Sequence, residues 1–200
     1  MAKSRYEKML KKSQKISLPR RILREIILWT VCLSAAVGGA YYLSNRYFMK
    51  TEMVGTAMLP TIEEGCEILI EKFSYERQDP ERFDIVVYRE DSEEHHFYYV
   101  RRIIGLPGEL VQIQNGVIRI NGEAVTEPMA VDPMEYGGLA EDGLRVPAGT
   151  YFVLGDNRNA SEDSRYATIG NIPEENIVGR AWLSLSPIEV LAERNPAKEE

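Results

Sequence analysis

The feature that most constrains this 200-residue chain is an uncharged segment of eighteen residues near its N-terminus, Ile26 to Leu43. A helix of this length is long enough to cross the hydrocarbon core of a bilayer. Trp29 lies near one end of the segment and Tyr41 near the other, as is typical of side chains at membrane interfaces. No later segment is apolar enough to span. The sequence therefore predicts a single transmembrane anchor over residues 26–45.

The charge of the chain divides at this segment. Residues 1–25 carry nine basic and two acidic side chains, a net charge of +7, whereas the whole chain carries −7. Because basic residues favour the cytoplasmic side of a span, we expect a basic cytoplasmic segment over 1–25 and an acidic domain outside the cell membrane. A cleaved secretory signal is the competing interpretation, since Gly38 and Ala40 are small, but a cut there would fall inside the apolar run. Contact of the basic segment with anionic lipid is reasonable, and no nucleic-acid-binding fold accompanies it.

Short β-branched and aromatic runs alternate with turn residues after residue 50. We expect strands at 66–73, 83–89, 97–104, 110–113, 117–120, 150–154 and 178–185. Asn115-Gly116 and Asn121-Gly122 favour tight turns, so residues 110–125 are predicted to form an antiparallel meander. No long amphipathic helical pattern follows the anchor. The predicted fold is therefore all-β, mainly antiparallel and partly closed, with one N-terminal transmembrane helix.

The predicted domain boundaries follow from these patterns. Residues 50–188 would form the extracytoplasmic β domain, within which residues 128–149 lack periodicity and suggest a loop excursion. Residues 189–200 suggest a polar tail.

Cysteine and histidine give little indication of a metal or redox site. Cys32 lies in the predicted span and Cys66 outside it, so we do not expect them to pair, and their spacing excludes a CxxC motif. His95 and His96 are adjacent and have no carboxylate or Cys at ligand spacing. We expect two small buried thiols, no metal and no cofactor.

Four sequence blocks resemble those of one enzyme family. They are Met58 to Thr61 (MLPT), Arg82 to Tyr88 (RFDIVVY), Tyr99 to Glu109 (YVRRIIGLPGE) and Gly155 to Arg165 (GDNRNASEDSR). Their order and spacing resemble the bacterial type I signal peptidases (serine peptidase family S26), in the short Gram-positive form. These are membrane-anchored serine proteases that remove signal peptides from exported proteins. The resemblance extends over almost the whole chain from the anchor to Pro187.

The same resemblance indicates that both catalytic groups are replaced. The family uses a Ser nucleophile, immediately before the Met of the first block, and a neutral Lys base, immediately before an Arg of the third. Here these positions hold Ala57 and Arg101. Alanine has no heteroatom with which to attack, and a guanidinium stays protonated even when buried. Thr56 does not substitute, since neighbours along an extended chain point to opposite sides.

The resemblance implies that the supporting residues are kept. Ser161 matches the residue that hydrogen-bonds the catalytic Lys, while Asp163 and Arg165 match an ion pair that shapes the site. The backbone N–H of Ala57 stands at the position of an oxyanion donor, whereas Gly55 replaces a side-chain donor that some members have. An extended peptide would add as a strand to residues 84–88. The predicted groove residues are Met58, Pro60, Asp84, Ile85, Val86 and Val87.

Three functions stay open at this point. The first is a catalytically inactive, membrane-anchored homologue that binds exported preproteins or pilin-like clients, because dyad-less relatives are associated with pilus assembly as chaperone-like partners. The second is a type I signal peptidase, a serine endopeptidase acting on exported preproteins, whose sequence carries Ala57 and Arg101 as engineered replacements. The third is a scaffold with a blocked groove. The sequence indicates no oligomeric state.

Overall fold

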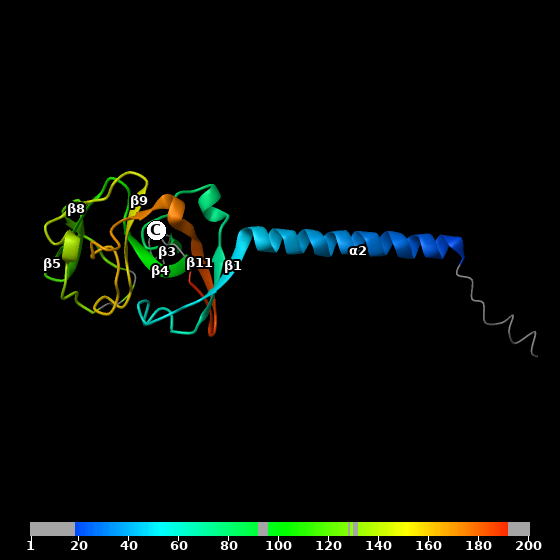
Figure 1. Ribbon diagram of the computed structural model, residues 1–200, viewed down its shortest axis with the longest axis horizontal. Coiled ribbons are helices and arrows are strands. Elements are labelled where there is room, and N and C mark those ends of the chain that lie inside the picture. Colours follow the sequence, from blue (N-terminus) through cyan, green and yellow to red (C-terminus); the bar gives the residue numbers. More distant parts are fainter. Residues whose placement is uncertain (1–18, 92–95, 128, 130–131, 192–200) are drawn as a thin grey trace, which may run out of the picture. The chain divides into compact units, whose positions relative to one another are not determined.

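The computed structural model describes residues 19–91, 96–127, 129 and 132–191. The chain divides into two compact units, 1–45 and 46–200. The first is represented by most of the helix α2 (Arg20–Tyr47), which has no buried residue and appears as one long ribbon in Figure 1. It is long and apolar enough to span a bilayer. The hydroxyls of Thr30 and Ser34 donate to helix carbonyls one turn back, at 2.8 Å each, so these polar groups are satisfied inside the apolar run.

The second unit is built on a sheet of eight strands in the order β1-β2-β11-β3-β4-β9-β10, with β12 paired to β11. Every pairing in it is antiparallel within the described residues. Three 3-10 helices connect strands, η1 (Ser74–Glu76), η2 (Gly138–Ala140) and η3 (Glu174–Asn176). The strands are β1 (Phe48–Glu52), β2 (Glu67–Glu71), β3 (Ile85–Asp91), β4 (His96–Gly105), β9 (Thr150–Leu154), β10 (Ile172–Pro173), β11 (Ile177–Leu185) and β12 (Ile188–Val190).

A second sheet of four strands, also antiparallel, has the order β7-β6-β5-β8. Its strands are β5 (Leu110–Gln114), β6 (Val117–Ile120), β7 (Glu123–Ala124) and β8 (Leu144–Arg145). Asn115 and Gly116 connect β5 to β6 with φ values of 51° and 77°, and Asn121 and Gly122 connect β6 to β7 with 53° and 92°. Asn-Gly tolerates two successive positive φ angles, which a tight hairpin turn requires. The predicted meander is confirmed.

Apolar side chains pack on both faces of the main sheet, because successive residues of β3 and β4 point to opposite faces and are apolar on each. Ile85, Val87 and Val100 pack with Met58 on one face. Val86, Tyr88, Ile103 and Val153 pack together in a separate cluster. The small sheet covers a third cluster that includes Ile113, Ile118 and Phe152. A mostly antiparallel β structure with one N-terminal apolar helix is the fold class that the sequence predicted.

The strand pattern extends further than expected in two places. Glu189 and Val190 pair with β11 and Leu191 is only 3% exposed, so the sheet continues past the boundary predicted at residue 188. The excursion at 128–149 contributes Met134 and Val146 to the third core cluster. Both segments have too few apolar residues in a row to show a period. Residues 192–200 and His95 lie outside the described residues.

Candidate functional site

The loop Gly155–Arg165, which follows β9, is organised around one buried carboxylate. Asp163 accepts hydrogen bonds from Ser161 Oγ (2.7 Å), Gly155 N (3.1 Å) and the Arg165 guanidinium (2.8 and 2.9 Å). Asp163 and Arg165 are 0% and 1% exposed, so the charges are fully removed from water but paired. The structure thus brings together the three residues that the sequence assigned to the support of the site.

The segment that contains Ala57 packs directly on this loop. The Ala57 carbonyl accepts a hydrogen bond from Asn157 N (3.0 Å), and the Thr56 carbonyl accepts one from Asn157 Nδ2 (3.1 Å). A Cβ added at Gly155 would lie 2.5 Å from Ser161 Oγ and 2.6 Å from the Ala57 oxygen. Glycine is therefore needed at 155 because the two segments approach so closely. Ala57 itself is 9% exposed.

Arg101 reaches the same loop from β4. Its Nε and Nη2 donate to the carbonyl oxygen of Glu162 at 3.1 and 2.7 Å, and its Nη1 donates to the carbonyl oxygen of Val100 at 2.8 Å. The guanidinium also lies 5.9 Å from the centre of the Tyr99 ring. Arg101 is 6% exposed, and no carboxylate of the described residues lies within ion-pair distance of it. Ala57 and Arg101 are thus held by one and the same loop.

Sequence reasoning missed two further buried arginines beside the site. Arg102 makes a two-bond ion pair with Asp156 (2.8 and 2.7 Å) and donates to the Phe83 carbonyl (2.9 Å). Arg158 pairs with Glu127 through both carboxylate oxygens. A charged residue inside an otherwise apolar strand, as at Arg102, was the available signal, because such a residue is rarely buried without a partner.

The residues predicted to form the groove differ in their exposure to solvent. Met58, Ile85, Val86 and Val87 are at most 3% exposed and belong to the core, whereas Pro60 is exposed. Asp84 accepts hydrogen bonds from Tyr75 Oη (2.9 Å) and Glu81 N (3.1 Å).

The strand chosen for peptide addition has no free edge at its centre. Within β3, Val86 pairs with Arg101 of β4 on one side and with Arg180 of β11 on the other. β4 differs, because β9 pairs with it only from Arg102 to Gly105. Over residues 98–101 the second edge of β4 has no strand partner within the described part of the chain. The edge of β4 next to Arg101 therefore differs from the centre of β3, which is paired on both sides.

Tyr88 lies on the same face of the sheet as Arg101 and Tyr99. Its ring stacks on that of Tyr99 with centroids 5.5 Å apart. Its hydroxyl is buried without a hydrogen-bond partner. Burial raises the pKa of Tyr88 far above its ordinary value, so the phenol stays neutral and provides neither a nucleophile nor a base near neutral pH.

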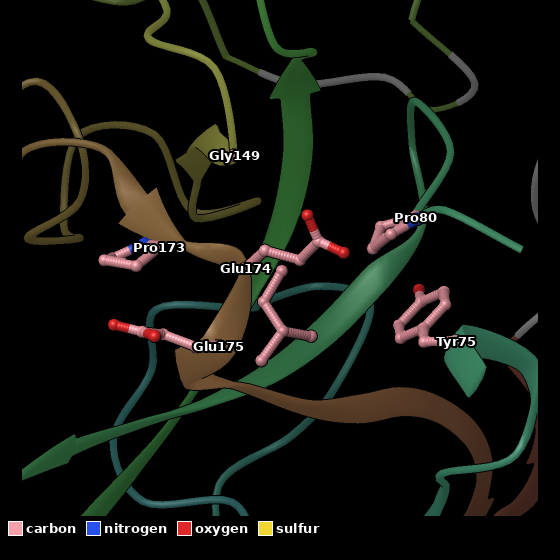
Figure 2. A pocket seen from close by; sticks show the side chains of 7 residues that line it. Tyr75, Pro80, Gly149, Pro173, Glu174 and Glu175 are labelled. Carbon is pink, nitrogen blue, oxygen red and sulfur yellow. The ribbon is translucent and has the colours of Figure 1, made fainter.

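A cavity of about 500 Å³ is lined by a different set of residues. Figure 2 shows Tyr75 and Pro80 on one side of it and Pro173, Glu174 and Glu175 on the other. None of the predicted site residues lines it. Among the described residues, no group of three or more His, Cys, Asp and Glu side chains is placed to hold a metal ion.

Comparison with known proteins gives consistent results. The family model for signal peptidase, peptidase S26, matches residues 23–185. The signal peptidase I of Leptolyngbya laminosa is 38% identical over 167 residues, 80% of this chain and 78% of its own length. The signal peptidase I V of Bacillus subtilis is 35% identical over 162 residues, which cover 76% of this chain and 94% of that protein.

A crystal structure of a signal peptidase I from Enterococcus faecalis is 33% identical, with a TM-score of 0.41, and the match covers 52% of this chain and 97% of that one. The family model covers most of the present chain, and the two relatives above exceed 30% identity over about three quarters of it or more. This chain therefore belongs to the signal peptidase family, peptidase S26.

Proposed function

We propose that this chain is a membrane-anchored signal peptidase homologue that binds exported polypeptides without cutting them. The observation that carries the proposal is the state of Arg101, at the position where the family resemblance puts the Lys base. Its Nε, Nη1 and Nη2 all donate to backbone carbonyls. A guanidinium is protonated at any physiological pH and has no lone pair with which to accept a proton.

The nucleophile position argues in the same direction. Ala57 presents a methyl group where the family has a hydroxyl, so no acyl-enzyme can form there. Outside the basic N-terminal segment, the lysines among the described residues are Lys50 and Lys72. Lys50 is exposed and lies 3.5 Å from Glu67 on the adjacent strand, and Lys72 directly follows β2. Neither belongs to the loop that holds Ala57 and Arg101.

Peptide binding is supported by what is kept. The loop Gly155–Arg165 has a complete hydrogen-bond network around Asp163, although no chemistry now uses it. The β4 edge beside Arg101 has no strand partner over residues 98–101 in the described part of the chain. An extended chain binds such an edge through main-chain hydrogen bonds, which need neither a nucleophile nor a base.

Orientation and clients belong to the same proposal. The basic segment at 1–25 would lie in the cytoplasm, α2 would span the membrane, and the β domain would lie outside, where exported preproteins emerge. Pilin-like proteins are the clients that the family resemblance favours.

The test is restoration of the dyad. Full-length protein in detergent is assayed with a signal-peptide substrate as wild type, Ala57→Ser, Arg101→Lys and the double variant. We expect no cleavage by the wild type or by either single variant, and cleavage by the double variant, because the Ser hydroxyl and the Lys amine act as a unit. Adding Ser161→Ala to the double variant should then lower its rate. Cleavage by the wild-type chain would refute the proposal.

A working peptidase with introduced replacements is the second candidate, and one observation favours it. Ser161, Asp163, Arg165 and Gly155 keep the fully bonded arrangement that the family resemblance assigns to the support of catalysis. The codons of the natural gene distinguish the two candidates. Ser and Lys codons at positions 57 and 101 would establish the second, and Ala and Arg codons would exclude it.

A further inference from the structure

The unpartnered edge of β4 presents the backbone groups of alternate residues. Ile103 directs both its N–H and its C=O toward β3, where they bond to Asp84 O (2.9 Å) and Phe83 N (2.8 Å). Neighbouring residues of an antiparallel strand point their backbone groups to opposite edges. The pairing of β3 with β4 is regular from His96 to Arg102. Tyr98 and Val100 therefore present their N–H and C=O groups to the edge that lacks a strand partner.

One of these edge groups already has a partner from within the chain. Arg101 Nη1 donates to the Val100 carbonyl at 2.8 Å. The guanidinium is fixed in position, because its Nε and Nη2 donate hydrogen bonds to the Glu162 carbonyl oxygen at 3.1 and 2.7 Å. Arg101 and Val100 are 6% and 3% exposed, so the capped carbonyl is shielded from water as well. A peptide that pairs with this edge can therefore bond to the N–H and C=O of Tyr98. The C=O of Val100, by contrast, is capped, meaning that it already accepts a hydrogen bond from Arg101.

We propose that Arg101 determines the specificity of the peptide groove by capping Val100, so that the groove favours a residue without an N–H, proline, opposite that carbonyl. This inference rests on the proposed peptide-binding function. An ordinary residue would place its N–H against a carbonyl that already accepts from Arg101 Nη1 at 2.8 Å, so the two donors would compete for it at the edge. A buried N–H that is poorly bonded for this reason weakens binding. Proline has no N–H to leave unsatisfied.

A methylation scan tests the inference. A signal-peptide segment is N-methylated at one residue at a time, which removes one N–H as proline does, and each peptide is titrated against the full-length chain by fluorescence anisotropy. In the wild type, methylating the peptide residue opposite Tyr98 should weaken binding of the peptide. Methylating the peptide residue opposite Val100, two positions along, should not. In Arg101→Met, that second position should become sensitive by about fivefold, the equivalent of one hydrogen bond of about 1 kcal/mol.

Lys50→Met is the matched control, because it also replaces a cation by methionine but lies on β1. It should leave the scan unchanged. Proline-for-alanine peptides on the wild type give a second readout that does not depend on how a variant folds: proline opposite Val100 should be tolerated and proline opposite Tyr98 should not.

Two outcomes would overturn the inference. One is equal sensitivity of both edge-facing positions in the wild type, and the other is an unchanged scan in a folded Arg101→Met. Failure of the unmethylated peptide to bind the wild type at all would instead refute the proposed function.

Discussion

At the scale of single residues, the site is held by arginines that are buried together with their partners. Arg102 and Asp156 are 1% and 2% exposed and share two hydrogen bonds. A buried pair of this kind adds little to stability compared with apolar residues, but a single remaining partner is costly because its charge stays buried and unpaired. Such pairs therefore fix the positions of β4 and the loop Gly155–Arg165 more than they add to net stability.

Asp156→Asn should lower the free energy of unfolding by about 3–5 kcal/mol, since it leaves the Arg102 charge without its carboxylate. Thermal unfolding of the full chain in detergent measures the loss. Glu67→Gln is the control, because Glu67 forms an exposed pair with Lys50 (3.5 Å) and should contribute less than about 1 kcal/mol. Equal effects of the two substitutions would contradict this account.

Tyr151 should make the domain less stable in alkali. Burial, reinforced by Glu174 and Asp79, raises the pKa of Tyr151 from 10.0 to about 12. Below the ordinary pKa of 10.0 the phenol is neutral in both the native and the unfolded state. Between the two values the unfolded chain loses the proton and the native state does not, so the free energy of unfolding falls as the pH rises. Thermal melting across this range should show a shallower decline for Tyr151→Phe than for the wild type, and an equally steep decline in the two would contradict this account.

At the scale of elements, the sequence predicted most of the strands that carry the site, because their β-branched runs are bounded by clear turn residues. The pairing of those strands was not available from local pattern. β3 has an apolar pattern typical of a strand covered on both faces, but only the structure places β11 and β4 at its two edges. The Arg102–Asp156 pair joins residues 54 positions apart, which no sequence spacing reveals.

The two Asn-Gly turns allow a matched test at this scale. Gly116 and Gly122 both have positive φ, but a Cβ at Gly116 would lie 3.2 Å from Met134 N, whereas a Cβ at Gly122 meets nothing within 4 Å. Gly122→Ala should destabilise by about 1–2 kcal/mol through its φ angle alone. Gly116→Ala should cost about 1 kcal/mol more, because the Met134 segment must move. Thermal melting that ranks the two variants in the opposite order would contradict the turn assignment.

At the scale of the whole molecule, the proposed orientation in the membrane rests on the charge division and can be tested with cysteine labelling. Cys66 is buried and should resist a membrane-impermeant maleimide, and Cys32 lies within α2. Val54→Cys introduces a thiol at a position that is 83% exposed in the β domain. It should react in intact spheroplasts, whereas Ser4→Cys in the basic segment should react only after lysis. The reverse pattern would contradict a cytoplasmic N-terminus.

The central claim, that this chain holds an exported peptide without cutting it, is tested most directly by one measurement on the wild-type protein. A fluorescent signal-peptide substrate is titrated with full-length protein in detergent, and the same samples are then analysed by mass spectrometry. The account predicts saturable binding with every recovered peptide intact. Cleaved peptide above the level of a protein-free control, or no binding at all, would contradict it.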